Sequence, residues 1–139
     1  MTAKEYLQKI KDLEKCIMQL NTDIQNLADM ATSITQTMKQ DAVQSSGSQQ
    51  RMADAVTAMV YKKEMLAENI ELYLSTSSLI KSQIDDMPKR RIRDLLWYRY
   101  VEGLTFEKIA VEMDLSWRHV IRLHGTALKE FAEKYSDFF

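Results

Sequence analysis

Apolar residues in the first forty positions recur at alternating spacings of four and three. This heptad pattern predicts one long amphipathic helix whose apolar stripe packs against another helix, as in a coiled coil. Thr2 with Glu5 three residues later matches a capping box, so we expect the helix to begin at once. The stripe consists of Ile10, Ile17, Ile24, Ala31 and Met38 at one heptad position and of Tyr6, Leu13, Leu20, Leu27 and Ile34 at the other.

The polar stretch KQDAVQSSGSQQ at residues 39–50 interrupts this pattern and predicts a turn. Its SSGS run lacks the spacing and the lysine of a phosphate-binding loop, so we interpret it as a helix-capping turn with Ser46 or Ser48 as N-cap. A second heptad stripe follows, and Pro88 ends that helix or begins the next element. The stripe consists of Met52, Val56, Met59, Lys63, Leu66, Ile70, Tyr73, Ser77, Ile80, Ile84 and Met87.

Two stripes of nearly equal length predict a long antiparallel helical hairpin, a coiled coil, over residues 1–87. A short loop favours this pairing because it holds the second helix at a high effective concentration. The alternative is a parallel dimer, which the isoleucine and leucine positions of the first helix favour. The second helix also carries apolar residues away from its stripe, so we expect a second copy or the C-terminal segment to cover them. The predicted oligomer interface is Met65, Leu72 and Leu79.

The last fifty residues carry three shorter amphipathic segments. Residues 89–102 are expected to form a helix that Gly103 stops, and Thr105 is the expected N-cap of a second short helix. Asp114 and Leu115 then form a turn, and Ser116 caps a longer third helix. This order is the helix-turn-helix arrangement, so we predict an all-α chain with a small three-helix domain at residues 88–139. The residues expected to face inward are Ile92, Leu95, Leu96, Tyr100, Phe106, Ile109, Ala110, Val120, His124, Ala127 and Phe131.

Glycine and proline are rare, with three Gly and one Pro among 139 residues. This composition leaves little material for tight hairpins and excludes a strand-rich sandwich or barrel. The net charge of −1 gives no whole-chain reason to expect nucleic acid. The charge is uneven, however, because residues 1–87 carry a net charge of −3 and residues 88–139 one of +2. The basic residues of residues 88–139 are also clustered, so a nucleic-acid partner is considered for this part of the chain.

Candidate catalytic and metal-binding residues are scarce. The single cysteine, Cys16, allows no internal disulfide and no cysteine-based zinc site, and two histidines five residues apart make a poor metal set. No Ser/His/Asp or Cys/His arrangement is recognisable, so we expect no enzymatic activity, no cofactor and no metal. The apolar runs are short and no apolar leader opens the sequence, so we expect a cytoplasmic protein that does not contact the membrane.

The third helix of the C-terminal segment carries the candidate DNA-reading residues. Its predicted base contacts are Trp117, Arg118, Ile121 and Arg122, which face away from the apolar side. Either arginine can bind guanine through O6 and N7, and Trp117 can pack on a thymine methyl, on a sugar or on its own domain's core. The cluster at residues 89–93 is also open to other interpretations, a solvated helix start or a contact with RNA polymerase. The predicted phosphate contacts are Thr105, Lys108, Ser116, Lys129 and Arg91.

Several of these residues belong to recognisable motifs. The run RYVEGLTFEKIA at residues 99–110, with Leu115, Ser116, Val120 and Ala127, resembles region four of bacterial sigma factors, the module that reads the −35 promoter element. This resemblance covers roughly residues 89–133. The stretches VQSSGSQ, MADAV and RLHGTAL at residues 43–49, 52–56 and 122–128 make the whole chain similar to a family of phage and prophage proteins of Gram-positive bacteria. That family is similar to the ArpU and RinA late-gene regulators.

The resemblance implies a phage-encoded, sequence-specific DNA-binding transcriptional regulator of late or packaging genes. Its expected partners are double-stranded DNA, RNA polymerase and a second copy of the chain. Two alternatives stay open: a module that binds RNA polymerase or another protein without reading DNA, and a small-terminase-like packaging adaptor that forms larger rings. Asp114 stands where the sigma pattern has glycine, which Asp tolerates because it can adopt a left-handed backbone. His124 stands where the pattern has leucine, and we interpret it as a partly buried histidine bonded to the backbone.

Overall fold

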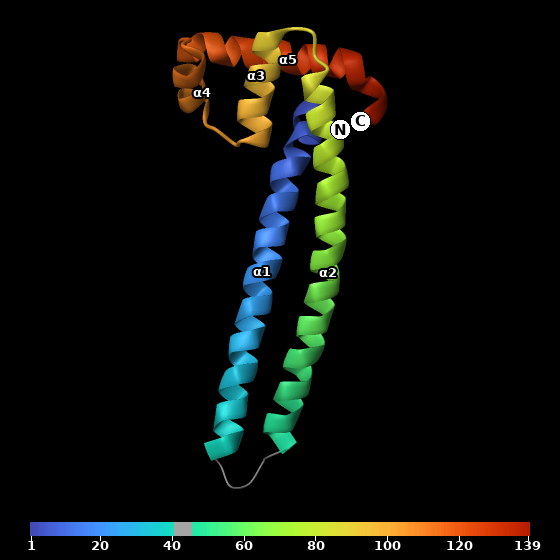
Figure 1. Cartoon of the computed structure of the whole chain (residues 1–139), viewed down its shortest axis with the longest axis vertical. Coiled ribbons are helices and arrows are strands. Elements are labelled where there is room, and N and C mark those ends of the chain that lie inside the picture. Colours follow the sequence, from blue (N-terminus) through green and yellow to red (C-terminus); the bar gives the residue numbers. More distant parts are fainter. Residues whose placement is uncertain (41–45) are drawn as a thin grey trace. The chain divides into compact units, whose positions relative to one another are not determined.

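The computed structural model describes residues 1–40 and 46–139, and within them it is all-helical. The all-α prediction is therefore confirmed for the described part of the chain (Figure 1). The elements are α1 (Ala3–Gln40), α2 (Ser46–Asp85), α3 (Arg90–Leu96), the π-helix η1 (Trp97–Val101), α4 (Phe106–Met113), α5 (Trp117–Tyr135) and the 3₁₀-helix η2 (Ser136–Phe138).

The chain divides into two compact units. Unit 1 contains residues 1–13 and 73–139, and unit 2 contains residues 14–72. The predicted boundary between residues 87 and 88 falls inside unit 1, because the first turns of α1 and the last turns of α2 share a core with the C-terminal helices. Sequence periodicity assigned both long helices to one domain, whereas each of them contributes residues to both units.

The start of α1 follows the sequence prediction. Thr2 N donates to Glu5 Oε2 at 2.8 Å, and Glu5 N donates to Thr2 Oγ1 at 3.2 Å. This reciprocal pair satisfies two backbone donors that the first turn of a helix leaves free. The hydrogen bond with the Thr2 backbone also lowers the pKa of Glu5.

The polar stretch predicted as a turn is shorter than expected. Helix α2 begins at Ser46, so residues 46–50 are helical and Ser48 lies in the first turn rather than at the N-cap. The remainder of the predicted turn, residues 41–45, lies outside the described residues. Apolar burial of α2 outweighs the weak helix propensity of its Ser- and Gly-bearing start.

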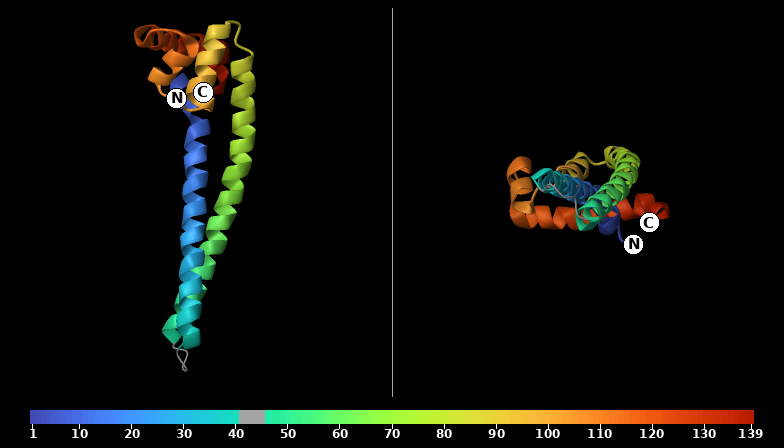
Figure 2. Two further views of the ribbon diagram at one scale, coloured as in Figure 1. Left: turned by 60° about the vertical axis from the view of Figure 1, so that its left-hand side comes forward. Right: turned by 90° about the horizontal axis from the view of Figure 1, so that it is seen from below.

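Unit 2 consists of α1 and α2 residues that run side by side in opposite directions (Figures 1 and 2). Leu20 and Ile34 on α1 and Ala55 on α2 are buried, and most other inward side chains are half-buried. Lys62 Nζ lies 3.3 Å from Asp23 Oδ2 and links the two helices. Two helices alone form a single layer, which shields inward side chains on one side only.

The heptad stripe assigned to α2 is partly wrong in unit 2. Val56 is 48% exposed and Ile70 is 40% exposed, although both were expected to face α1. Ala55 and Lys62 occupy that face instead, one residue earlier in each heptad. A straight α-helix drifts by about 20° per heptad relative to a strict seven-residue repeat, so the stripe, which is fully buried at Ile80 and Ile84, has rotated away from α1 at Val56, four heptads before Ile84.

The core of unit 1 draws on both ends of the chain. Tyr6 of α1 packs against Phe131 and Phe139, with ring centroids 6.0 and 5.2 Å apart, and Phe131 is fully buried. Tyr6 Oη donates to Gln83 Oε1 of α2 at 2.7 Å. The same core contains nearly all residues that were expected to face inward from the C-terminal helices, among them Ile92, Leu95, Leu96, Tyr100, Ile109, Ala110, Val120, Ala127 and Phe131.

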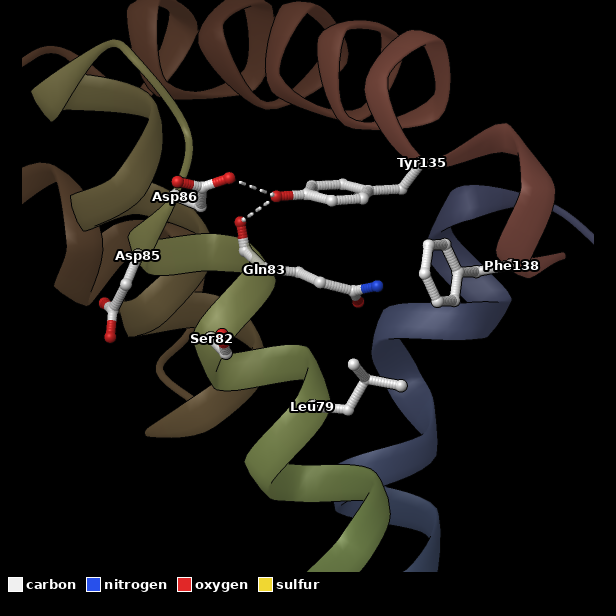
Figure 3. A pocket seen from close by; sticks show the side chains of 7 residues that line it. All are labelled: Leu79, Ser82, Gln83, Asp85, Asp86, Tyr135 and Phe138. Carbon is white, nitrogen blue, oxygen red and sulfur yellow. Dashed lines mark hydrogen bonds between the residues drawn. The ribbon is translucent and has the colours of Figure 1, made fainter.

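Hydrogen bonds and an ion pair join the end of α2 to the end of α5 (Figure 3). Tyr135 Oη lies 3.1 Å from Gln83 O and 3.2 Å from Asp86 Oδ2, and it donates to this pair of acceptors. Lys134 Nζ lies 3.1 Å from the same carboxylate. The bonds from Lys134 and Tyr135 lower the pKa of Asp86. These contacts hold α5 against α2 within unit 1.

Candidate nucleic-acid interface

Each helix around the predicted turn begins with a side-chain cap. Thr105 Oγ1 accepts from Lys108 N at 3.3 Å at the start of α4, and Ser116 Oγ accepts from His119 N at 3.1 Å at the start of α5. Asp114 ends α4 with φ 54° and ψ 47°, the left-handed conformation expected for it. Its N–H bonds back to the last turn of α4. The sequence therefore folds locally as a short helix, a three-residue turn and a longer helix.

Helix α5 has an inner and an outer side. Val120, Ala127 and Phe131 are fully buried and fix the inner side against α3 and α4. The outer side carries Arg118, Arg122 and Lys129, all exposed, at helical spacings of four and seven. Residues 117–129 of α5 contain no acidic residue, so this exposed row is purely cationic.

The four predicted base-contact residues meet in one place. Trp117, Arg118, Ile121 and Arg122 line an open hollow of about 430 Å³ on the first two turns of α5. Trp117 is 50% exposed, so half of its surface is open to solvent beside the hollow. Trp117 and Ile121 are one turn apart and form an apolar row, and Arg118 and Arg122 form a cationic row beside it. Neither guanidinium has an ion pair or hydrogen bond within the described residues.

Five residues were predicted as phosphate contacts, and all of them are exposed: Thr105, Lys108, Ser116, Lys129 and Arg91. The hydroxyl oxygens of Thr105 and Ser116 already accept the capping bonds, so each hydroxyl has only its proton to offer an anion. Arg91 differs from its basic neighbours, since Lys89 pairs with Glu130 at 2.7 Å and Arg90 pairs with Asp94 at 3.8 Å. No such pair involves Arg91 in the described chain.

A polar contact inside unit 1 joins α5 to the π-helix η1. Tyr100 Oη lies 2.7 Å from His124 Nε2, and the two rings stack at 5.8 Å. Burial, with the charges of Arg99 and Lys4, lowers the pKa of His124 to about 4, so the imidazole is neutral near pH 7. Burial also raises the pKa of Tyr100 to about 12, so its hydroxyl keeps the proton near pH 7.

The contact between Tyr100 and His124 extends to α4. The ring of Phe106 meets His124 edge-on at 4.9 Å, and the guanidinium of Arg99 lies 4.1 Å above the ring of Phe106. Arg99 Nη1 donates to Leu104 O at 3.0 Å. His124 was expected to be partly buried, which is confirmed, but its partner is a tyrosine side chain rather than the backbone. The π-helix η1, in which Tyr100 lies, had no signal in the sequence.

Comparisons of the chain with protein-family models, with curated proteins and with solved structures found no match.

Another hollow of unit 1 has the opposite charge. It measures about 360 Å³ and lies at the far end of α5, where Asp85 and Asp86 stand beside Leu79, Tyr135 and Phe138 (Figure 3). Its carboxylates would repel a phosphate backbone, so it is a poor nucleic-acid site. The described residues include no group of three or more His, Cys, Asp or Glu side chains arranged to hold a metal ion. None of the described helices is long and apolar enough to span a membrane.

Proposed function

We propose that the chain is a sequence-specific DNA-binding transcriptional regulator whose helix-turn-helix, formed by α4 and α5, places α5 in the major groove. The observation that carries this proposal is the pair of exposed guanidinium groups on Arg118 and Arg122, neither of them neutralised by a carboxylate. An arginine forms a bidentate pair with guanine O6 and N7, and each good pair contributes about 1–3 kcal/mol of discrimination. The phage origin and the late or packaging genes are part of this proposal and rest on the sequence resemblance alone.

The phosphate contacts proposed for Lys108, Lys129 and Arg91 give the interface its salt dependence. Exposed cations release counterions when they neutralise phosphates, so affinity falls as salt rises. The amide groups at the start of α5 add a second kind of anion contact, because Ser116 satisfies only one of the free donors there.

The chain acts as a homodimer in this proposal, and residues 1–87 form an antiparallel coiled-coil hairpin that provides the dimer contact. Of the predicted interface, Leu72 is 52% exposed and Leu79 is 45% exposed, whereas Met65 is half-buried. Val60 and Leu74 of α2 are also more than half exposed. One module with so few cations binds a single site weakly, and a second copy adds a second half-site.

The test is selection from a pool of random-sequence duplexes across a salt series, followed by affinity measurements on the enriched sequence. We expect the wild type to enrich one motif in the bacterial cytoplasmic salt range. The double variant Arg118→Ala/Arg122→Ala should lose most of the preference for that motif over random duplex. The matched control Arg51→Ala/Lys63→Ala removes the same charge from unit 2 and should keep the preference. Binding without any preferred sequence in the wild type would overturn the proposal.

A second candidate, a protein-binding module that contacts RNA polymerase, is favoured by one observation. Val111 on α4 is 78% exposed, more than any other large hydrophobic residue of the described chain. Under this alternative, Val111→Lys would abolish polymerase binding, and Arg118→Ala/Arg122→Ala would leave it intact at high salt. A pull-down of RNA polymerase with the wild type and with these variants separates this candidate from the leading proposal.

A further inference from the structure

We propose that the hollow at the far end of α5, which we call the acidic hollow, is a docking site for an extended peptide segment of a partner protein. The segment carries a lysine or arginine beside an apolar residue. Helix α5 has 19 residues, so about 27 Å separates Tyr135 in this hollow from Trp117 at the start of the helix. The site is therefore distinct from the candidate nucleic-acid interface and goes beyond the proposed function.

The floor of the acidic hollow holds a buried amide with an unused donor. Gln83 is only 4% exposed, and its Oε1 accepts from Tyr6 Oη at 2.7 Å. Its Nε2 has no hydrogen-bond partner within the described residues and points between Leu79 and Phe138 (Figure 3). A buried donor without a partner costs about 1–3 kcal/mol, which an acceptor oxygen bound there would restore. The amide therefore indicates a ligand with such an oxygen, and a peptide backbone supplies one at every residue.

The rim of the acidic hollow is apolar and open. Leu79 is 45% exposed and Phe138 is 50% exposed, and both lie beside the Gln83 amide (Figure 3). The amide nitrogen itself is shielded from solvent, so a partner oxygen reaches it when one of these rim side chains changes rotamer. Rotamer changes of this kind are common when proteins bind. We therefore expect the peptide to lay an apolar side chain against Phe138 and to place a backbone oxygen on Nε2.

The charge around the acidic hollow selects a basic segment. Asp86 is neutralised by Lys134, whose Nζ lies 3.1 Å from its carboxylate. Asp85 is exposed at the edge of the hollow and has no ion pair within the parts of the chain that the structure describes. Residues 130–137 add three carboxylates and only one lysine at this end of the helix. A cationic side chain brought to Asp85 is therefore favoured, and an anionic partner is repelled.

These three features together favour a peptide as the occupant. The hollow measures about 360 Å³, which gives room for a few side chains. A small amine would satisfy Asp85 but would leave the apolar rim and the Gln83 amide unused. Neighbouring residues of an extended peptide present a cation, an apolar group and a carbonyl oxygen within a few ångströms of one another, as the lining requires.

The experiment is an array of synthetic peptides in which two adjacent central positions take every combination of amino acids and the flanking positions are mixtures. The labelled full chain is applied without DNA, so the result does not depend on the proposed function. We expect the strongest binding from pairs that join lysine or arginine with leucine, isoleucine, methionine or phenylalanine. The best peptide is then titrated in solution by fluorescence anisotropy.

Variants of exposed residues place this peptide in the acidic hollow. Asp85→Asn should weaken binding by about threefold, as expected for an exposed ion pair. Phe138→Ala should weaken it by about tenfold, because the apolar side chain of the peptide loses its contact. The matched control Asp137→Asn removes an exposed carboxylate that does not line the hollow and should bind as the wild type does. Arg118→Ala/Arg122→Ala should also bind the peptide normally.

A second pair of variants tests the buried amide. Tyr6→Phe removes the bond to Gln83 Oε1 but keeps Nε2, so it should bind the peptide as the wild type does. Tyr6→Phe/Gln83→Met removes both polar partners, a change that leaves stability nearly unaltered. Relative to Tyr6→Phe, this double variant should bind about fivefold more weakly, the ratio that one hydrogen bond corresponds to. Equal affinity of the two would contradict the bond to Nε2.

The remaining outcomes decide the proposal as follows. A preference for basic and apolar pairs that Asp85→Asn and Phe138→Ala weaken supports it. No preference for such pairs, or a preference that neither variant changes, overturns it. A lower mass of these two variants in sedimentation equilibrium, without any preferred peptide, would assign the acidic hollow to a second copy of the chain and would overturn it as well.

Discussion

Unit 1 and unit 2 bury their apolar side chains to different degrees. The core of unit 1 is enclosed by helices on several sides, and Leu7, Leu95, Val120 and Phe131 are completely buried. Unit 2 has only two helices, and none of its described side chains is completely buried. The difference teaches that a two-helix layer does not enclose a core, so apolar residues such as Val60 and Leu72 stay exposed on the outer faces of α2.

The largest expected effect is the loss of an aromatic ring from the core of unit 1. Phe131→Ala removes a side chain that packs against Tyr6, Tyr135 and Phe139, and we expect the free energy of unfolding of unit 1 to fall by about 3–5 kcal/mol. Both tryptophans lie in unit 1, so tryptophan fluorescence during denaturation with urea reports this unit.

Leu20→Ala in unit 2 is the matched comparison. Leu20 is 4% exposed, but its single-layer surroundings can collapse around a shorter side chain. We therefore expect the free energy of unfolding to fall by about 2 kcal/mol. Denaturation followed by far-ultraviolet circular dichroism measures this loss. An equal loss in the two variants would contradict the difference in enclosure that we describe.

The next prediction concerns the proposed contact between α2 and a second copy of the chain. Leu72→Lys/Leu79→Lys places two charges on exposed apolar positions of α2, and we expect the proposed dimer to dissociate into monomers with unchanged helical content. Each buried leucine lost corresponds to about 1.5–3 kcal/mol of association free energy. Sedimentation equilibrium measures the mass, and Met18→Lys on the exposed side of α1 is the control. An unchanged mass would exclude these residues from the interface, and a mass of many copies would favour a packaging ring.

A smaller effect follows from the neutral histidine of unit 1. The pKa of His124 is about 4 in the folded chain and near 6.5 in the unfolded chain, so the unfolded state binds more protons between these values. The free energy of unfolding of unit 1 should therefore fall by about 1–3 kcal/mol as the pH falls from 6.5 to 4.

A variant of the chain's other histidine, His119, is the control for this pH dependence. His124→Leu should abolish the decline in the free energy of unfolding, and His119→Leu should retain it. Fluorescence-detected urea denaturation between pH 4 and pH 7 measures the slope. A decline of equal size in His124→Leu would assign it to other groups. Unit 2 contains no histidine, so it has no such transition in this range.

Substitutions at two glycines are expected to change the free energy of unfolding least, and the two changes have opposite signs. Gly103 has φ +74°, and a Cβ there would also lie 2.9 Å from Lys11 Cε, so Gly103→Ala should lower the free energy of unfolding by about 1–2 kcal/mol. Gly125 lies inside α5 with open space around it, so Gly125→Ala should raise that energy by about 0.5–1 kcal/mol. Thermal denaturation of both variants checks the signs. Under the proposed function, the added methyl of Gly125→Ala should also weaken binding of α5 to DNA.

Residues with local causes were predicted correctly from the sequence. The capping box of Thr2 and Glu5, the caps Thr105 and Ser116, and the left-handed Asp114 depend on neighbours within a few positions. The hollow of Trp117, Arg118, Ile121 and Arg122 was also foreseeable, because residues one turn apart on a helix lie together.

Residues whose surroundings come from distant parts of the chain were not predicted correctly from the sequence. The partner of His124 is Tyr100, 24 positions away, and no local pattern indicates a bond between them. Val56 and Ile70 were misassigned because a strict heptad assumes a supercoil that α2 does not keep over its whole length. The membership of Tyr6 in the C-terminal core likewise needs tertiary contacts that hydrophobic periodicity does not encode.

The shared core of the two chain ends also bears on how the molecule folds. Unit 2 joins segments that are consecutive in the chain, whereas the Tyr6 and Gln83 side chains that meet in unit 1 are 77 positions apart. Contacts of high sequence separation slow the search for the native state, because a long stretch of chain loses its freedom before they form. During synthesis, the first turns of α1 leave the ribosome long before their partners in α5. We therefore expect a refolding chain to acquire helix quickly and its tryptophan environment late.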